Sequence, residues 1–438
     1  MGRDHTVNRR AFFTTAFLGL TAKADRLITG RIVDDSHLLG HKLRERAKFP
    51  SPKRVERIPV VIAGGGIAGL SAAWRLDKRG FRDFVLLEME KQAGGNARWG
   101  ENEITPFPWA AHYVPVPGKN SPLVRELFEE LGVLRDGVWE EQHLCHSPQE
   151  RLFLHGRWQE GLLPEVAATA RDRQQYRRFE QRMAEFRASG EFRIPMASGA
   201  RRALHLDRLS MAAWMKAGGF DSAYLNWYVD YACRDDYGTR ARETSAWAGI
   251  HYFAAREQEE DGPLTWSEGN GWIVRQLLRK LGRYVRTGAM VYRIGRRGRG
   301  FRVLAGEVEY HCDRVLFATP TFLLPYVLED APPPAGAVEY SPWITANLTL
   351  DRPPAERGAP RAWDNVFYNS PSLGYVVATH QSLRTREDRS VWTWYRPLCD
   401  GPPAAGRRML LARDWAYWKE TILNDLAPAH PDIRSCVS

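Results

Sequence analysis

Residues 58–88 hold the pattern that most limits what this chain can fold into, because an apolar strand, a glycine-rich turn, a helix, a second apolar strand and an acid follow without interruption. Gly64 permits the tight turn, Gly66 lets a pyrophosphate approach the main chain, and Gly69 lets the helix pack on the sheet. The helix N-terminus attracts an anion, and Glu88 is placed to accept hydrogen bonds from a ribose. The unit predicts a Rossmann-like dinucleotide site.

Length and charge set further limits on the chain. Its 438 residues exceed what one hydrophobic core usually serves, so we expect two domains. The net charge is +10, yet the basic residues are scattered among 52 acidic ones, apart from a dense stretch at 293–302 that we interpret as a turn between strands. We therefore expect a small-molecule substrate and no nucleic-acid partner.

The cysteines give no sign of a disulfide framework or a metal centre. There are five of them, an odd number, and no two have the spacing of a zinc site. His143, Cys145 and His146 lie close together, but no second ligand pair accompanies them, so we interpret this stretch as a polar loop. No metal ligand is predicted.

Residues 1–24 resemble a twin-arginine-type signal segment. Arg9 and Arg10 precede an apolar stretch that is too short to span a bilayer. The resemblance implies the twin-arginine export machinery as a partner, a periplasmic destination for a protein already folded around its cofactor, and membrane contact only if the leader is uncleaved. A chance arginine pair before a short amphipathic helix is the alternative. Residues 25–57, which are charged, are predicted as a linker or arm.

A second glycine pair follows the acid, in the segment Gly94-Gly95-Asn96-Ala97-Arg98. This arrangement resembles the FAD-dependent amine oxidase superfamily, which includes protoporphyrinogen oxidases and phytoene desaturases and has a Gly-Gly-Arg element at this place. Here Asn96 replaces the arginine, and Arg98 stands two positions on. The resemblance further implies that Ala110 and Ala111 pass close to the flavin ring and that the backbone of Val291 contacts adenine.

These observations define two sets of candidate residues. For FAD binding they are Gly64, Gly65, Gly66, Ile67, Ala68, Gly69, Glu88, Gly94, Gly95, Asn96, Arg98, Ala110, Ala111 and Val291. No catalytic residue is assigned. For the substrate cavity, residue type and position point to His112, Tyr113, Tyr231, Asp235, Asp236, Tyr237 and Trp266.

The resemblance also implies the architecture, an α/β fold in which a Rossmann-like FAD/NAD(P)-binding domain carries an inserted mixed α+β substrate domain. The FAD-binding domain is expected to be discontinuous, with residues 58–118 and 265–320, and the substrate domain to hold 119–264 and 321–438. The family ends with a Gly-Asp strand and a helix that hold the flavin, and no such motif follows Asp414. We therefore expect the C-terminus to be truncated.

The expected function is an FAD-dependent oxidoreductase that moves a hydride from an amine or an unsaturated hydrophobic substrate onto flavin N5. Many oxygen-using relatives carry a lysine in the stretch that matches 343–348, and this chain has none there, which favours an acceptor other than oxygen. One alternative is a catalytically defective flavin-binding fragment acting as a binding protein. Another is a nicotinamide-dependent reductase, which would need a second phosphate-binding fingerprint that the sequence does not show.

Overall fold

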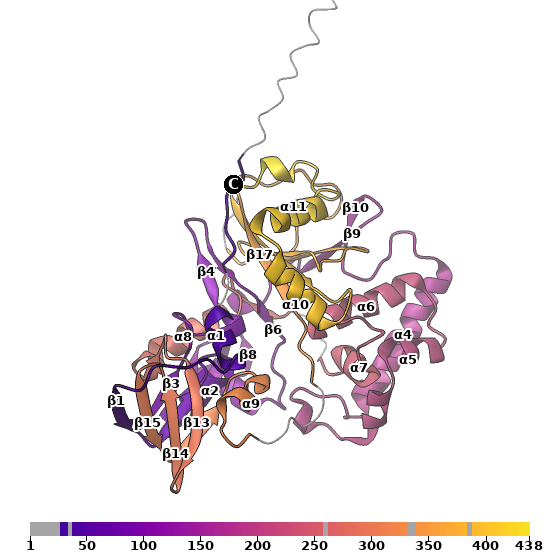
Figure 1. The fold of residues 1–438 in the computed structure, drawn as a ribbon. Coiled ribbons are helices and arrows are strands. Elements are labelled where there is room, and N and C mark those ends of the chain that lie inside the picture. Colours follow the sequence, from indigo (N-terminus) through magenta and orange to yellow (C-terminus); the bar gives the residue numbers. More distant parts are fainter. Residues whose placement is uncertain (1–26, 34–36, 257–261, 332–337, 383–387) are drawn as a thin grey trace, which may run out of the picture.

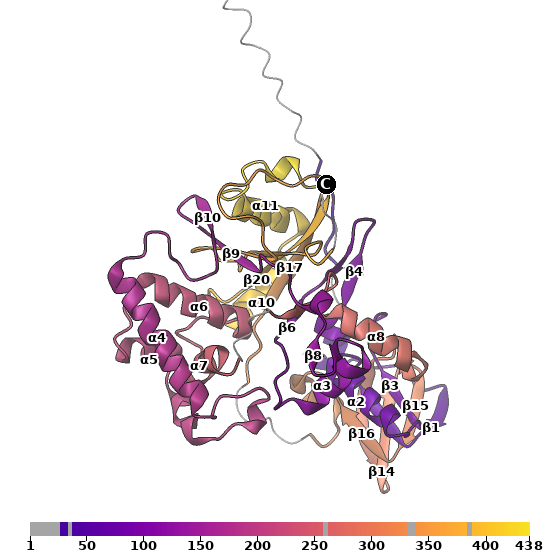
Figure 2. The same cartoon turned by 180° about the vertical axis from the view of Figure 1, so that it is seen from behind.

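The computed structural model describes residues 27–33, 37–256, 262–331, 338–382 and 388–438 (Figure 1). The predicted leader, 1–24, lies outside the described residues. The strands β1, β13, β14 and β15 and the helices α2 and α8 form one lobe, a second lobe holds the helices α4 to α7, and β17 and α11 lie in a third region. The view from behind shows the same three regions (Figure 2).

A parallel sheet forms the centre of the first lobe. Its order is β12-β3-β2-β16, and all three neighbouring pairs run parallel. The strands are β2 (Val60–Ala63), β3 (Phe84–Leu87), β12 (Val285–Arg286) and β16 (Arg314–Phe317), and α2 (Ile67–Lys78) crosses over from β2 to β3. A parallel sheet with a crossover helix is the predicted Rossmann-like arrangement.

A second sheet packs beside it in the order β1-β15-β14-β13. It is built from β1 (Arg54–Arg57), β13 (Val291–Arg297), β14 (Gly300–Ala305) and β15 (Val308–Cys312). The stretch predicted as a linker or arm therefore differs from that expectation, because it supplies β1, which pairs in parallel with β15, and also the helix α1 (His37–Arg44). Short charged strands of this kind give little hydrophobic signal in a sequence.

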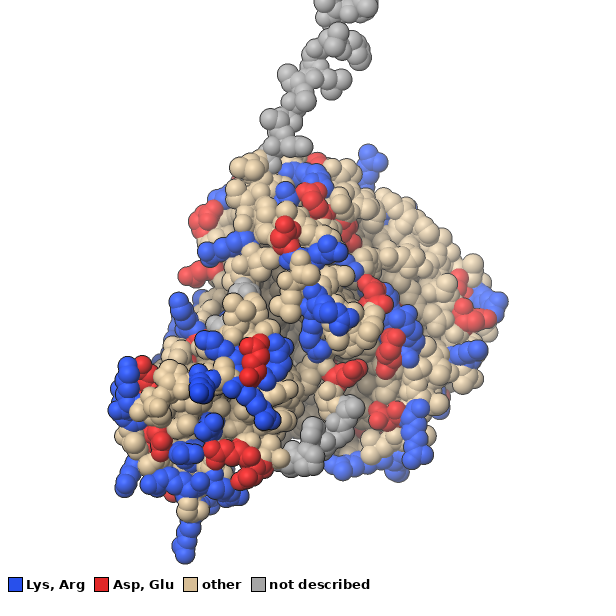
Figure 3. All heavy atoms as spheres, in the orientation of Figure 1, with Lys and Arg blue, Asp and Glu red and all other residues tan. Residues whose placement is uncertain are grey.

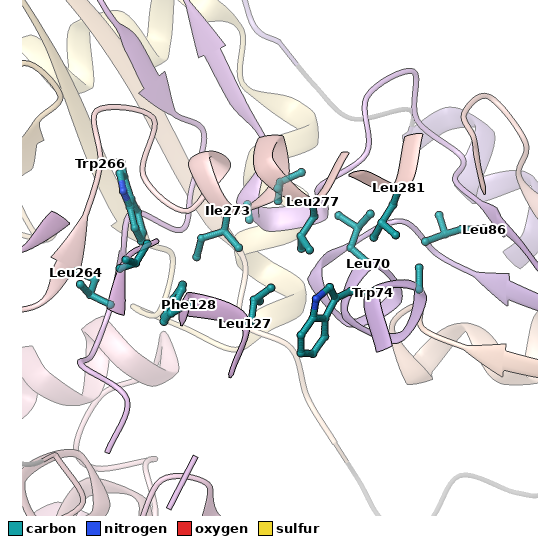
Figure 4. Packing of buried hydrophobic residues seen from close by; sticks show 14 of the residues in the cluster. Leu70, Trp74, Leu86, Leu127, Phe128, Leu264, Trp266, Ile273, Leu277 and Leu281 are labelled. Carbon is teal, nitrogen blue, oxygen red and sulfur yellow. The ribbon is translucent and has the colours of Figure 1, made fainter. Parts of the chain in front are cut away.

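One hydrophobic cluster joins α2, α8 (Gly271–Leu281) and α3 (Pro122–Glu130) beneath the parallel sheet (Figure 4). Buried Ile273, Leu277 and Leu281 recur at helical spacing along α8 and face Leu70 and Trp74 of α2. Helix α3 was expected in the substrate domain, yet its Leu127 and Phe128 belong to this same cluster. Where the two domains divide stays a prediction.

The third region is a six-stranded sheet in the order β10-β9-β18-β19-β20-β17. Its strands are β9 (Glu150–Leu154), β10 (Arg157–Glu160), β17 (Trp343–Leu350), β18 (Asp364–Phe367), β19 (Tyr375–Val377) and β20 (Ser390–Pro397). Only β9 and β18 pair in parallel. The helices α10 (Pro403–Ala412) and α11 (Trp415–Leu426) lie next to this sheet.

The two faces of this sheet pack on different helices, because side chains alternate along a strand. On β18, Phe367 belongs to the cluster that includes Leu423 of α11, whereas Val366 belongs to the one that includes Tyr231 of α6 (Ala223–Tyr237). Helix α6 thus covers the face opposite α11. Its other side packs with α4 (Ala170–Ala188), α5 (Met211–Ala217) and α7 (Ala246–Ala254).

This architecture confirms the predicted fold class, an α/β nucleotide-binding domain carrying a mixed α+β domain. Among the described residues, no helix has the length and apolar character needed to cross a membrane.

Candidate cofactor and substrate site

The turn between β2 and α2 has no room for larger residues at two of its glycines. Gly64 has a φ of +109°, a conformation that favours glycine. A Cβ on Gly69 would lie 1.9 Å from the carbonyl oxygen of Gly64, so the first turn of the helix packs directly on the bend. These two positions shape the turn and bring the N-terminus of α2 to the edge of the sheet.

Gly66 differs, because the space beside it is open. It is the N-cap of α2 with an ordinary φ of −72°, and no side chain caps the helix. A Cβ there would meet nothing nearer than the Cα of Gly95, at 3.9 Å. The second glycine turn faces the first, since Gly94 donates its N–H to the carbonyl oxygen of Gly65 at 2.8 Å. Bare main chain and an uncapped helix N-terminus fit a pyrophosphate.

Glu88 is turned toward this glycine turn, and its side chain is buried. Its Oε2 accepts the N–H of Gly65 at 2.6 Å, and its Oε1 accepts the N–H of Glu90 at 2.8 Å. Each carboxylate oxygen can accept a further hydrogen bond, so both stay able to receive a ribose hydroxyl. The carboxylate is held in place by the same turn that is predicted to face the pyrophosphate.

The remaining candidate cofactor residues come from three segments of the chain, at 67–68, 96–111 and 291. Ala111 donates to the carbonyl oxygen of Asn96 at 3.0 Å, and Arg98 donates its Nε to the carbonyl oxygen of Gly95 at 3.2 Å. Just before Val291, Ala289 donates to the carbonyl oxygen of Glu88 at 2.7 Å. Ile67 and Ala68 are exposed at the start of α2, and Ala110 is partly exposed. These hydrogen bonds bring the two glycine turns, the 96–111 segment and the chain just before Val291 together, and contact with FAD stays a prediction for each residue.

Beyond Ala111 the chain runs straight into a cavity. His112 and Tyr113, the latter in β6 (Tyr113–Val114), form part of its wall. The cavity has a volume of about 170 Å³. Its lining residues are His112, Tyr113, Pro115, Gln149, Glu150, Leu162, Tyr231, Asp235, Tyr252, Arg256, Pro263, Trp363, Asp364 and Tyr395. The predicted flavin-proximal segment and the cavity therefore share one continuous piece of main chain.

Three of the lining residues are carboxylic acids. Glu150 and Asp364 stand opposite each other in the parallel register of β9 and β18, and Asp235 comes from α6. Two carboxylates directly opposite each other on neighbouring strands destabilise a sheet, so the presence of this pair has no explanation in strand pairing. Asp364 accepts hydrogen bonds from the hydroxyls of Tyr231 and Tyr395, at 3.3 and 3.1 Å.

Burial acts on all three acids in the same direction. It raises the pKa of Asp364 well above its usual range, and it also raises the pKa of Glu150. For Asp235, burial together with the nearby Asp236 carboxyl raises the pKa to about 7, against the opposing effect of Arg256. By surface exposure Asp364 is buried, Asp235 is half-buried and Glu150 is exposed at the start of β9, and none of the three carboxyls has an ion-pair partner among the described residues.

Arg256 stands between this cavity and a neighbouring one of about 250 Å³, and it lines both. Its Nη2 donates to Asp236 at 2.8 Å and to the hydroxyl of Tyr113 at 3.1 Å. The guanidinium lies over the ring of Tyr252, 4.0 Å from the centroid. The outer cavity is lined by Tyr113, Pro115, Ile194, Asp236, His251, Tyr252 and Arg256.

Five of the seven residues predicted from the sequence to line the substrate cavity lie at one of the two cavities, and two do not. His112, Tyr113, Tyr231 and Asp235 line the inner cavity, and Asp236 lines the outer cavity. The other two do not. Tyr237 donates its hydroxyl to the carbonyl oxygen of Ala248 at 2.7 Å, and Trp266 lies in the core shown in Figure 4, donating to Nδ1 of His143 at 2.9 Å.

The cavity is also lined by four residues that were not predicted from the sequence, Glu150, Arg256, Asp364 and Tyr395. No motif surrounds these residues, and they come from different strands and a helix end. Within the part of the chain that the structure describes, no group of His, Cys, Asp and Glu side chains is arranged to hold a metal ion, and all five cysteines are free and buried.

The six-stranded sheet also contacts the predicted flavin-proximal segment. From β17, Thr345 donates its hydroxyl to the carbonyl oxygen of Trp109 at 2.5 Å, and Asn347 donates its amide to that of Pro108 at 3.1 Å. These bonds fix the segment between the nucleotide-binding lobe and the sheet that carries Asp364. The molecular surface is hollowed between the lobes in Figure 3, and lysine and arginine spheres gather over the lobe that holds β1 and β14.

Comparison with known proteins gives one family and several similar folds. Residues 67–429 match the family described as flavin containing amine oxidoreductase. A structure of putrescine oxidase bound to putrescine has a TM-score of 0.65 at 16% identity and covers 88% of this chain and 84% of its own. For cyclohexylamine oxidase from Brevibacterium oxydans IH-35A, the TM-score is 0.62 at 14% identity, with 87% and 83% covered.

Two further likenesses are weaker in fold or more limited in extent. A CLA-producing fatty acid isomerase from P. acnes has a TM-score of 0.58 at 14% identity and covers 85% of this chain and 82% of its own. The mouse mitochondrial pyruvate dehydrogenase phosphatase regulatory subunit is 34% identical over 74 residues, 17% of this chain and only 8% of that protein. At these identities the solved structures show the fold alone.

Proposed function

Because this chain belongs to the flavin-containing amine oxidoreductase family, we propose that it oxidises a cationic amine held in the carboxyl-lined cavity. The family confirms the resemblance predicted from sequence, FAD as the cofactor and the oxidoreductase class. When bound, the flavin accepts the hydride equivalent from the substrate C–H bond. The protein holds the cofactor, orients the amine and excludes water.

The charge of the cavity is the observation that carries this proposal. Glu150, Asp235 and Asp364 line a space of about 170 Å³ in which Arg256 is the one arginine or lysine among the lining residues. Buried carboxyl groups without ion-pair partners are unfavourable unless they bind a proton or a cation. An ammonium group supplies that cation, whereas an unsaturated hydrocarbon leaves the carboxyls uncompensated. The cavity therefore favours an amine over an unsaturated hydrophobic substrate.

The aromatic walls support the same choice. Rings of Tyr113, Trp363 and Tyr395 surround His112, whose ring centroid lies 5.5, 5.6 and 5.1 Å from theirs. Aromatic faces attract cations, and they also shield a C–H bond from water. The names of two similar folds, putrescine oxidase and cyclohexylamine oxidase, agree with an amine substrate.

For the cofactor, the chain's own groups would act as follows. The amides at the start of α2 and the two glycine turns would hold the pyrophosphate, and Glu88 would hold the ribose. The segment with Ala110 and Ala111 would lie beside the ring, because it continues into the cavity through His112.

The test is an anaerobic titration of the FAD-loaded protein with putrescine and cyclohexylamine, followed by the absorbance of the oxidised flavin. Bleaching by an amine, and none by an uncharged alkene of similar size, is the expected result. Asp364→Asn should lower the rate of bleaching, while Glu185→Gln on the exposed side of α4 serves as the matched control. Failure of every amine, with FAD firmly bound, would favour the alternative of a flavin-binding protein without catalysis.

We also propose that the protein is exported by the twin-arginine route, on the evidence of Arg9 and Arg10 and the apolar stretch behind them. This route accepts folded proteins with bound cofactor, which suits a flavoprotein.

A further inference from the structure

Asp235, one of the three acids that line the inner cavity, has no hydrogen-bond partner among the described residues. Two of its neighbours are engaged, since Asp364 accepts two tyrosine hydroxyls and Asp236 pairs with Arg256. Asp235 lies on α6 and lines the inner cavity. An unengaged acid in such a place holds either a proton or a cation.

We propose that a cation entering this cavity displaces a proton from Asp235, so that amine binding is an exchange of a proton for an ammonium group. The O–H bond of the Asp235 carboxyl breaks, the proton passes to solvent, and the carboxylate pairs with the incoming cation. No redox change is involved in this exchange. The proposal rests on the proposed function only in taking the cavity as the amine site.

The groups around Asp235 decide how strongly it holds its proton. Carboxyls of Asp236 and Glu150 disfavour its charged form, and the guanidinium groups of Arg256 and Arg234 favour it. Arg234 acts from a distance, since its Nη1 donates to carbonyl oxygens of 370–372 and its Nε pairs with Asp230. With burial as the largest effect, the pKa of Asp235 is raised to about 7.

The other titratable groups of the two cavities do not compensate Asp235 near neutral pH. Burial raises the pKa of each lining tyrosine, Tyr113, Tyr231, Tyr252 and Tyr395, so all stay neutral. Burial lowers the pKa of His112, which therefore stays uncharged. His251 lies in the outer cavity, where it faces Asp236.

A second, independent feature points to a cation as the ligand. The wall already holds one, since the guanidinium of Arg256 lies 4.0 Å from the centre of the Tyr252 ring. The inner wall presents further aromatic rings, Trp363 and Tyr395, to the same space. Aromatic faces and unpaired carboxyls together form the common recognition surface for substituted ammonium groups.

The experiment uses the FAD-loaded protein and tetramethylammonium, whose charge is permanent and which has no N–H proton to lose. Any proton released on binding then comes from the protein. Calorimetric titration in two buffers of different ionisation enthalpy gives the number released. We expect about half a proton per cation at pH 7, because a group with a pKa near 7 is about half protonated there.

The affinity for the probe should follow the same exchange. Below pH 7 the proton competes with the cation, so affinity should fall by up to about tenfold per pH unit, and it should level off above pH 8. Asp235→Asn should bind the probe more weakly, with little proton release and a flat profile, whereas Glu185→Gln should behave as the unmodified protein does.

Three outcomes would overturn the proposal: binding of the probe without proton release, unchanged release in Asp235→Asn, or no binding of the probe. The wild-type measurement decides the matter even if the variant fails to fold. Flavin reduction by amines without this release would reject the exchange alone, whereas release without flavin reduction would reject the proposed function alone.

Discussion

Gly66 allows the role of the glycine turn in cofactor binding to be separated from its role in folding. In Gly66→Ala the new Cβ would have no neighbour closer than 3.9 Å, and the backbone φ of −72° suits alanine. Alanine is a poorer N-cap than glycine but restricts the unfolded chain more, so the free energy of unfolding of the FAD-free protein should change by less than about 1 kcal/mol.

The same methyl group would occupy the space that a pyrophosphate needs. Loss of one or two hydrogen bonds to a charged phosphate removes about 2–4 kcal/mol of binding free energy. That corresponds to an FAD affinity roughly 30- to 700-fold weaker. The assay is a titration of the FAD-free protein followed by flavin fluorescence, with thermal unfolding of the same samples as the measure of stability.

Gly69→Ala is the matched control, because its Cβ would lie 1.9 Å from the carbonyl oxygen of Gly64. It should lower the free energy of unfolding without FAD by about 1–3 kcal/mol or more. If Gly66→Ala bound FAD as tightly as the unmodified protein, the pyrophosphate would not lie at this turn and the argument for the site would fail.

Three further changes test other parts of the molecule. Glu88→Ala leaves the buried Gly65 amide and the partly buried Glu90 amide without this acceptor and should lower the free energy of unfolding of the FAD-free protein by about 1–3 kcal/mol, measured by urea unfolding. Burial lowers the pKa of His430 to about 3, below its unfolded value of about 6.5, so its contribution to stability is present above pH 6.5 and lost as pH falls. His430→Gln should therefore flatten the acid side of the stability profile by up to about 1.4 kcal/mol per pH unit between pH 6 and 4, and an unchanged slope would contradict this assignment. Replacing Arg9 and Arg10 by lysine should retain the protein in the cytoplasm, as measured by cell fractionation, and undiminished export would exclude the twin-arginine route.

The nucleotide-binding part could be predicted because its signal is local. Strand, turn, helix and acid lie within residues 58–88, and each glycine has its own steric requirement. The helices α3 and α8 were also predictable, since their apolar residues recur at helical spacing.

The cavity could be predicted only in part, because distant segments build it. Glu150 and Asp364 become neighbours through one parallel strand pair, and a lone acid at a strand start carries no signal of its partner. Trp266 was a wrong candidate, because its size and polar tip suit a cavity wall and a buried core equally well. Arg256 follows α7 and is placed by tertiary packing alone.

The hydrogen bonds from Thr345 and Asn347 to the 108–109 backbone have a thermodynamic consequence. They attach the six-stranded sheet, which carries Asp364, to the same main chain that continues from Asn96 to the cavity, so the proposed FAD and amine sites share a continuous set of contacts. Linkage requires that any such coupling be reciprocal. If a bound amine slows the loss of FAD, then FAD must strengthen amine binding by an equal factor, and cofactor-depleted preparations would understate the affinity for substrate.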